Sequence, residues 1–434
     1  MLARLRSLSG SDTGRAAGMA GAVLAGNVVA LGFTVVFARV LGQAGYGSLA
    51  ALVSTFIILM VPGSALQTTV AREVSAAIAA GDASAGGGVR RWLQRLALLA
   101  VAVTVVSVFG RDVVAKVIGV DEHPWGAAGA LPAGALWLML SVERGALQAF
   151  QRYRLVGASI VIEQVARLGF GLALVGAGAD VSGAFLGTPL ALVTVVLALA
   201  LPLNRQLRGV APASWAGHRL RDLARRAAVP IAALALVAWL QDGHVIVVKH
   251  LASSDDAGAW GAAAVAAKAI MWVAIGLGLY LVPEAARRSR SGEDARGILV
   301  RTLGIVAALA VPMLLVFAVA AGPLLSIVFD VHGSAEALPW LGLAMSLLAL
   351  SYLATQFQLA LHRARFIAVL VAAAVAQPLL LLAIGDHLAT LAVGLLAIQA
   401  VMGAAMLVLA LRPPAVAERR VEPYEDRAPS LIEA

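Results

Sequence analysis

Long apolar stretches separated by short polar loops dominate the chain. A helix needs about 20 mostly apolar residues to cross the hydrocarbon layer of a membrane. Twelve stretches meet this requirement, which predicts an all-α polytopic membrane protein with twelve transmembrane helices. The predicted spans are 16–40, 46–70, 92–110, 125–150, 155–177, 181–203, 227–248, 257–283, 298–320, 337–361, 365–385 and 388–411.

The longest hydrophilic interruption in the middle of the chain divides the spans into two groups of six. We therefore expect two six-helix lobes that are pseudo-symmetric. The predicted organisation is a cytoplasmic N-terminal segment 1–15, an N-lobe 16–203, a cytoplasmic linker 204–226, a C-lobe 227–411 and a disordered cytoplasmic tail 412–434.

A weak internal repeat supports this division. Residues 44–51 (AGYGSLAA) and 257–264 (AGAWGAAA) share a small-residue start, an aromatic residue and a run of small residues, and each opens the second span of its half. Six spans per half insert both halves the same way up, which is a parallel repeat. In transporters built from such repeats, the substrate lies between the halves near the membrane midplane.

Composition excludes a soluble protein. Hydrophobic residues make up 61% of the chain and charged residues 13%, with a mean hydropathy of +0.90. Soluble domains carry about 25% charged residues. A disulfide scaffold is also excluded because the chain has no cysteine.

The positive charges predict the orientation. The net charge is +9, but 26 of the 33 lysines and arginines lie in alternate loops, so topology explains them and nucleic-acid binding does not. The positive-inside rule places these loops and both termini in the cytoplasm. The remaining cations are Arg39, Arg111, Lys116 and Lys249 near the other loops, and Arg144, Arg167 and Lys268 inside spans.

Enzyme signatures are missing from the sequence. It contains no GxxxxGK[ST] phosphate loop, no HExxH zinc motif and no GxSxG nucleophile motif, and its seven histidines are scattered. We therefore expect a protein that is not an enzyme, with no cofactor and no metal site.

Ionisable residues inside the predicted spans are the first candidate site. Such residues are costly in a membrane and face a partner or a water-filled space. Glu143 and Arg144 lie in span 4, and Glu163 and Arg167 in span 5, all on the cytoplasmic side by spacing. Glu163 and Arg167 are four residues apart, which favours an ion pair on one helix face. The four either form a closed network that joins the spans or leave an arginine partly free to face an anionic headgroup.

A second group lies in spans 7 and 8. Asp242 and His244 belong to span 7, and Lys268 to span 8 at a depth that its long side chain can bridge. A buried lysine readily changes its protonation state. This group is either a structural pair or a pair that responds to protons or cations and couples them to transport.

Two junction motifs carry a family resemblance. Residues 37–47 read FARVLGQAGYG between spans 1 and 2, and the second half has Gly258 to Lys268 followed by Leu281-Val282-Pro283. With twelve spans in two halves, the sequence resembles the bacterial polysaccharide-biosynthesis flippases of the multidrug/oligosaccharidyl-lipid/polysaccharide exporter superfamily, over nearly the whole chain. Trp260 stands where the family usually has tyrosine.

This resemblance implies a flippase of the cytoplasmic (inner) membrane that moves a lipid-linked oligosaccharide, a polyprenyl-diphosphate glycan, by alternating access. It implies that spans 1, 2, 7 and 8 line the substrate cavity. Arg39 and Lys268 are then candidates for the anionic headgroup, Asn27 and Gln67 for sugar, and Asp242 for coupling. A monomer embedded in membrane lipid is expected, with glycosyltransferases or a polymerase of the same pathway as candidate partners.

Two other functions fit the same sequence. A multidrug exporter of the same superfamily would favour a negatively charged cavity, whereas the acids and bases inside the spans balance and Arg39 adds a cation at the rim. A non-transporting scaffold of a glycan-assembly complex would need every buried charge to be paired and no water-filled space between the halves.

Overall fold

The computed structural model describes residues 12–80, 85–207 and 228–412. This part of the chain is helical throughout, apart from short connections. The predicted N-terminal segment, linker and C-terminal tail lie mostly outside the described residues.

The helices form two bundles. The N-lobe comprises α2 (Asp12–Ala79), α3 (Ala85–Phe109), α4 (Arg111–Ile118), α5 (Pro124–Ala128), α6 (Ala130–Ala149), α7 (Tyr153–Gly176) and α8 (Asp180–Leu207). The C-lobe comprises α10 (Ala228–Leu251), α11 (Ser254–Ala267), α12 (Ala269–Arg290), α13 (Arg296–Leu324), the π-helical turn η1 (Leu325–Phe329), α14 (Leu338–Ala360), α15 (Phe366–Ile384) and α16 (Leu388–Leu411).

The number of spans agrees with the predicted twelve. Within the described residues, eleven helical stretches are long and apolar enough to cross a membrane. One of them, Gly18–Ala79, runs through a break at Gly42, where φ is 68° and ψ 174°. Glycine adopts this conformation without the steric cost that a Cβ would add. The stretch therefore contains the first two predicted spans, and the chain is a multi-pass membrane protein.

The structure adds elements that hydropathy did not predict. The short helix α4 follows α3 and ends at Gly119 with a left-handed φ of 82°. α2 continues to Ala79 and α12 to Arg290, beyond the predicted ends of these spans at 70 and 283. Hydropathy marks the part of a helix that contacts hydrocarbon, whereas the backbone hydrogen bonds of a helix continue into water.

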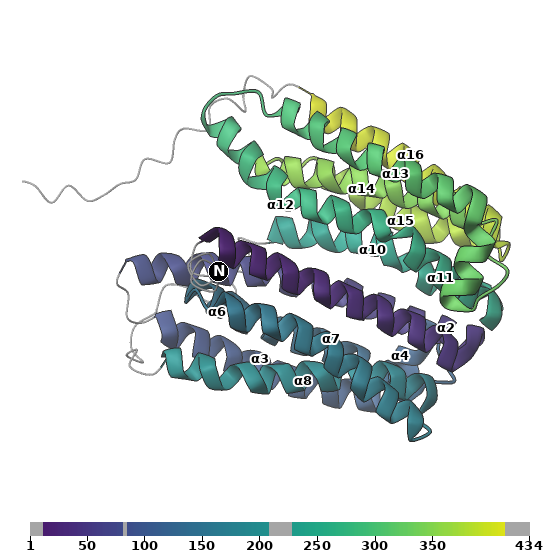
Figure 1. The fold of residues 1–434 in the computed structure, drawn as a ribbon, viewed down its shortest axis with the longest axis horizontal. Helices are drawn as coiled ribbons and strands as arrows, with labels where there is room; N and C mark the ends of the chain where they lie inside the picture. The colour runs from purple at the N-terminus through teal and green to yellow at the C-terminus, as the bar shows by residue number, and fades with distance from the viewer. Residues whose placement is uncertain (1–11, 81–84, 208–227, 413–434) are drawn as a thin grey trace, which may run out of the picture.

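The two ends of the molecule differ in charge. We call the end that carries Arg72, Arg90, Arg152, Arg205 and Arg363 the arginine end, and the other the opposite end. Figure 1 shows the two bundles lying against each other near the opposite end, at the right, and diverging toward the arginine end. α2 and α10 are the helices at the boundary between the lobes.

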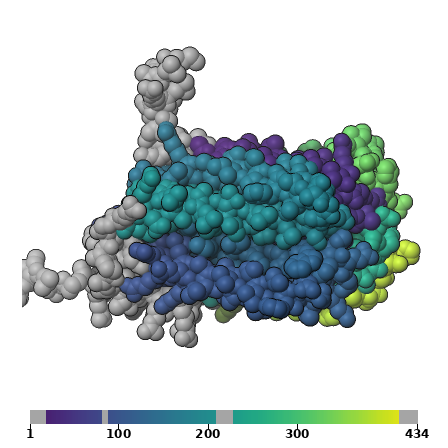
Figure 2. Space-filling view, turned by 90° about the horizontal axis from the view of Figure 1, so that it is seen from below, coloured from purple at the N-terminus to yellow at the C-terminus, as the bar shows by residue number. Residues whose placement is uncertain are grey.

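Apolar side chains cover the outer face of the N-lobe. Figure 2 shows α3 and α8 side by side on one face of the lobe. Leu98 and Val101 of α3 and Leu197 and Leu201 of α8 are each more than half exposed. Exposed apolar patches of this extent mark contact with a membrane. This face is therefore the lipid-facing surface of the lobe.

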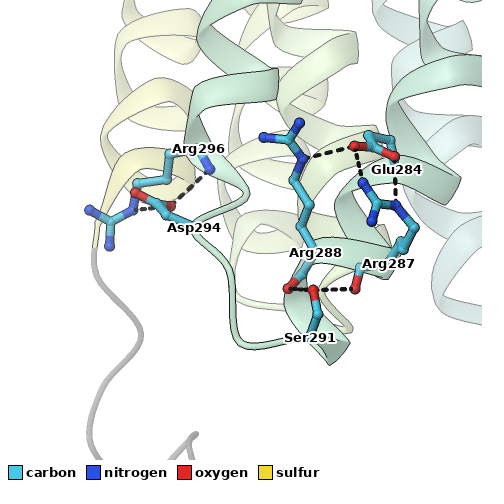
Figure 3. A network of polar contacts seen from close by, with 6 residues as sticks. All are labelled: Glu284, Arg287, Arg288, Ser291, Asp294 and Arg296. Atoms are coloured by element: carbon cyan, nitrogen blue, oxygen red, sulfur yellow. Dashed lines mark hydrogen bonds and ion pairs between the residues drawn. The ribbon is translucent and has the colours of Figure 1, made fainter.

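Salt bridges cluster at the arginine end, around the turn from α12 to α13 (Figure 3). The Glu284 carboxylate accepts hydrogen bonds from Arg287 at 2.8 and 3.0 Å and from Arg288 at 2.8 Å. Across the turn to α13, Asp294 lies 3.8 Å from Arg296. Exposed pairs of this kind contribute little to stability, about 0–1 kcal/mol. Their effect is to fix the cations at the surface where the membrane headgroups would lie.

Candidate functional site

Side chains join the two lobes at the opposite end. Gln43, next to the break in α2, donates hydrogen bonds from Nε2 to the carbonyl oxygens of Asp255 and His332 at 2.9 and 3.0 Å. Its Oε1 accepts from the His332 backbone N–H at 3.0 Å. One amide side chain of the N-lobe therefore binds two segments of the C-lobe.

Arg39 belongs to the same joint. Its Nη2 donates to the carbonyl oxygen of Ile327 in η1 at 2.5 Å, and the side chain is exposed. The sequence offered Arg39 as a cation for the substrate headgroup. The structure places it at the opposite end, on a backbone carbonyl of the C-lobe.

Backbones meet directly beside this joint. A Cβ built on Gly47 would lie 2.7 Å from the Gly258 nitrogen, and one built on Gly258 would overlap the Gln43 carbonyl. One on Gly261 would lie 2.8 Å from the Ala50 Cβ. Small residues permit this closeness, which is how membrane helices associate tightly without a hydrophobic driving force. The two repeat motifs thus form the contact surface between α2 and α11.

The contact between the lobes ends partway along α2. Positions spaced by three and four residues share one face of a helix. On α2, the face that meets the C-lobe at Gly47 continues along the helix through Ala50, Ser54, Ile57, Val61, Ser64 and Thr68. Gly47 to Ser54 are buried, the next two positions are half-buried, and Ser64 and Thr68 are exposed. This face of α2 is therefore covered by the C-lobe near the opposite end and is uncovered toward the arginine end, where the lobes lie apart.

A buried charged group lies where the contact ends. Lys268, at the junction of α11 and α12, forms an ion pair with Asp242 of α10, with Nζ 2.5 Å from Oδ1. Asp242 also accepts from Gln241 at 2.9 Å and from Ser54 Oγ at 3.3 Å. Asp242 is fully buried and Lys268 nearly so. The structure thus brings together the acid and the base of the second predicted group, and it adds Ser54 from the other lobe.

His244 lies in the same region but contacts a different residue. Its Nδ1 accepts a hydrogen bond from Trp260 Nε1 at 2.9 Å, and the two rings meet edge to face. His244 Nε2 is buried, with no hydrogen-bond partner in the described part of the chain. A ring that accepts at Nδ1 carries its proton at Nε2 when neutral. Trp260 therefore fixes both the orientation and the tautomer of His244.

The first predicted group forms a network inside the N-lobe. Arg144 of α6 donates to Glu163 of α7 at 2.7 Å and to Ser159 at 2.9 Å. Gln164 donates to the other Glu163 oxygen at 3.2 Å. The Arg144 guanidinium also lies 5.5 Å from the Trp137 ring centroid. This network joins α6 and α7.

The pairing inside this group differs from the prediction. Helical spacing favoured Glu163 with Arg167, whereas the carboxylate of Glu163 is held by Arg144 of the facing helix. Arg167 instead lies over the Phe33 ring of α2, 4.1 Å from its centroid. Glu143, one residue before Arg144, points elsewhere: both its oxygens are buried without a hydrogen-bond partner among the described residues.

The two predicted sugar contacts lie on α2 without partners. Asn27 and Gln67 are half-buried, and within the described residues neither side chain makes a hydrogen bond. Asn27 belongs to the first span and Gln67 to the second. Both amides belong to the helix that borders the C-lobe.

Several residues that connect elements in the structure were not predicted from the sequence. Gln43 stood inside a motif that marked the family, and Ser54, Phe33 and Trp137 are ordinary residues of apolar spans. The one available signal was the heptad-like spacing of small residues from Gly47 to Ser54, which predicts a close helix contact.

Comparisons with known proteins identify the fold. No family model matches the sequence, and no curated protein matches it. An inward-facing multidrug resistance MATE family transporter of the MOP superfamily matches with a TM-score of 0.76 at 13% identity, covering 89% of this chain and 93% of that chain. The lipid II flippase MurJ, in an inward closed conformation, matches with a TM-score of 0.70 at 10% identity, covering 92% and 88%.

An outward-facing multidrug resistance MATE transporter matches with a TM-score of 0.62 at 15% identity, covering 94% of this chain and 96% of that chain. The chain therefore has the fold shared by these transporters and by MurJ.

Proposed function

We propose that this protein is a secondary transporter that moves its substrate across the membrane by alternating access. One observation carries the proposal: the C-lobe-facing side of α2 is buried from Gly47 to Ser54 and exposed at Ser64 and Thr68. Two lobes that meet at one end only can rock about the substrate site and meet at the other end instead. Their likeness to an inward-facing transporter supports this view.

The distribution of arginine gives the direction of opening. The positive-inside rule assigns the arginine end and both chain termini to the cytoplasm. In this orientation the observed state opens toward the cytoplasm and is closed at the outer face by Gln43, Arg39 and the glycine contact.

We further propose that the substrate is a lipid-linked glycan carried on a polyprenyl diphosphate. Its sugars and diphosphate cannot cross hydrocarbon unaided, whereas its tail can remain in lipid while the head passes between the lobes. Ser64 and Thr68, with Asn27 and Gln67 on the same helix, supply hydroxyl and amide groups for sugar. The MurJ neighbour, a lipid II flippase by its name, supports the choice of a lipid substrate.

Asp242 and Lys268 are the proposed coupling pair. Their ion pair is buried, and Ser54 links it to the N-lobe. A change in the charge of either group weakens this link, because a buried charge without its partner is strongly destabilising. Proton or cation binding at the pair would thus alter how firmly the lobes are joined.

A transport assay tests the proposal. The purified chain is placed in liposomes with a fluorescent polyprenyl-diphosphate disaccharide, and dithionite quenching measures movement between leaflets. We expect faster movement than in protein-free liposomes, and slower movement with Lys268→Met. Movement of the cationic dye ethidium without movement of the lipid would favour the multidrug alternative. Movement of neither would overturn transport and favour a scaffold.

A further inference from the structure

Three cations lie inside the spans, and Arg39 was the cation predicted to meet the headgroup from their rim; three of these four are engaged. Lys268 is paired with Asp242, Arg144 with Glu163, and Arg39 donates to a backbone carbonyl. Arg167 makes no hydrogen bond and no ion pair within 4 Å in the described part of the chain. We infer that Arg167 is the anchor for the phosphate or diphosphate of the substrate's lipid headgroup, an inference that rests on the proposed transport of such a lipid.

The position of Arg167 suits a substrate site. At 1.5 Å per residue it lies about 21 Å along α7 from Tyr153, near the middle of the membrane. Phe33 of α2 lies under its guanidinium, and Phe37 packs against Phe33 at 4.6 Å between ring centroids. α2 is the helix that borders the C-lobe. The Arg167 side chain therefore lies between its own helix, α7, and this boundary helix.

The local geometry explains why this arginine has no partner. Glu163 is one turn away on α7, but one of its oxygens accepts from Arg144 and the other from Gln164. Both Glu163 oxygens are therefore held by other side chains, and neither lies within 4 Å of the Arg167 guanidinium. The Phe33 ring contacts the face of the Arg167 guanidinium in a cation–π interaction. This contact does not involve the N–H groups at the edge of the guanidinium.

An unpartnered guanidinium here calls for a ligand. It carries five N–H donors, and leaving a charged group unsatisfied in a low-dielectric interior is costly. Nε is buried without a hydrogen-bond partner among the described residues, and 9% of the surface of Arg167 remains exposed. A phosphate matches this fork with two parallel hydrogen bonds, the strongest arrangement for arginine.

Neighbouring groups extend the site beyond one charge. Gln164 Oε1, Trp137 Nε1 and Ser141 Oγ are all buried without hydrogen-bond partners among the described residues. Gln164 is the one of these that shares the helix of Arg167, three residues before it, and it donates to the same Glu163 carboxylate that Arg144 holds. Its carbonyl oxygen is therefore the acceptor that would extend a site built on Arg167.

A binding experiment tests this inference. The full-length purified chain is titrated with geranylgeranyl diphosphate, and intrinsic tryptophan fluorescence reports binding. We expect Arg167→Gln to weaken binding about tenfold or more, the scale of lost charged hydrogen bonds. Arg167→Lys retains the charge but not the bidentate fork, so its affinity should be intermediate. Arg154→Gln, which removes an exposed arginine from the same helix, should change affinity less than about twofold.

The outcomes separate the site from the proposed function. Unchanged affinity in Arg167→Gln, with a wild-type chain that moves the labelled lipid, would overturn the role of Arg167 and leave the function standing. A wild-type chain that neither binds the prenyl diphosphate nor moves it would overturn both. Inorganic pyrophosphate should bind more weakly than the prenylated form, and equal affinity would contradict a lipid headgroup.

A second variant covers the case in which Arg167→Gln does not yield a monodisperse protein. Phe33→Leu keeps the arginine and removes the ring that orients it. We expect severalfold weaker binding of geranylgeranyl diphosphate with the chain still folded. Wild-type affinity in both Phe33→Leu and Arg167→Lys would refute the site.

Discussion

Ser54 of the N-lobe donates a hydrogen bond to Asp242 of the C-lobe, with 3.3 Å between Oγ and Oδ1. The acceptor is the same oxygen that pairs with Lys268. Ser54 is also the last buried position on the C-lobe-facing side of α2. The place where the lobes separate is therefore the place where a buried charge of one lobe touches the other.

Removing this hydroxyl should loosen the joint between the lobes. Ser54→Ala leaves Asp242 with one fewer donor, and a hydrogen bond to a charged group contributes about 1.5–3 kcal/mol. We expect the population of the observed state to fall several-fold, measured by electron-electron resonance between spin labels on cysteines placed at the arginine end. The native chain has no cysteine, so the labels have no background. Thr55→Ala is the control, because within the described ranges the Thr55 hydroxyl bonds only to Ala51 of its own helix.

Removing one partner of the buried ion pair should lower the stability of the protein more than removing both partners. Asp242→Asn leaves the Lys268 ammonium buried without its counter-charge, which typically destabilises a protein by about 3–5 kcal/mol. The melting temperature in detergent, followed by tryptophan fluorescence, should fall clearly in Asp242→Asn and recover in Asp242→Asn with Lys268→Met. Additive losses in the double variant would show that the two residues do not act as a pair.

A side chain at the glycine contact should keep the lobes apart at the opposite end. A Cβ on Gly258 overlaps the Gln43 carbonyl, so Gly258→Val forces α2 and α11 to separate. We expect a single cysteine placed at Ala257, which is buried beside this contact, to react faster with a membrane-impermeant maleimide in this variant. Gly276→Ala serves as the control, since a Cβ there meets nothing within 4 Å. An unchanged rate would mean that the contact does not close this end.

Packing behind Arg167 should be equally sensitive to size. A Cβ on Gly187 of α8 would lie 2.6 Å from the Gly171 nitrogen and 2.7 Å from the Arg167 carbonyl oxygen. Gly187→Ala should therefore lower the melting temperature by several degrees, because backbone atoms cannot yield as a flexible side chain can. Gly169→Ala has open space around it and should be neutral or slightly stabilising, since alanine favours helix by up to about 1 kcal/mol over glycine. Equal effects at both positions would contradict close packing of α7 and α8.

Some of the site could be predicted from sequence, and some could not. The pairing of Asp242 with Lys268 followed from their depths in adjacent spans. A lysine side chain is long and flexible, so it can reach its partner even when the predicted depth is wrong by a few ångströms. The partner of Glu163 could not be predicted in this way. Spacing along α7 favoured Arg167, whereas the facing helix α6 brings Arg144 into contact with the carboxylate. Which of two arginines reaches a carboxylate depends on the rotation of each helix about its axis.

The sequence by itself determined the twelve spans, the break near Gly42, the division into two lobes and the placement of arginine at one end. These follow from the hydrocarbon thickness and from local backbone and charge rules, which act on each segment separately. Only the tertiary structure decided that Arg39 joins the lobes and that Ser54 reaches Asp242. It also decided that Arg167 has no hydrogen-bond or ion-pair partner among the described residues. Each of these depends on how one helix is rotated and inclined against another, and that is set by close packing of side chains across the whole bundle.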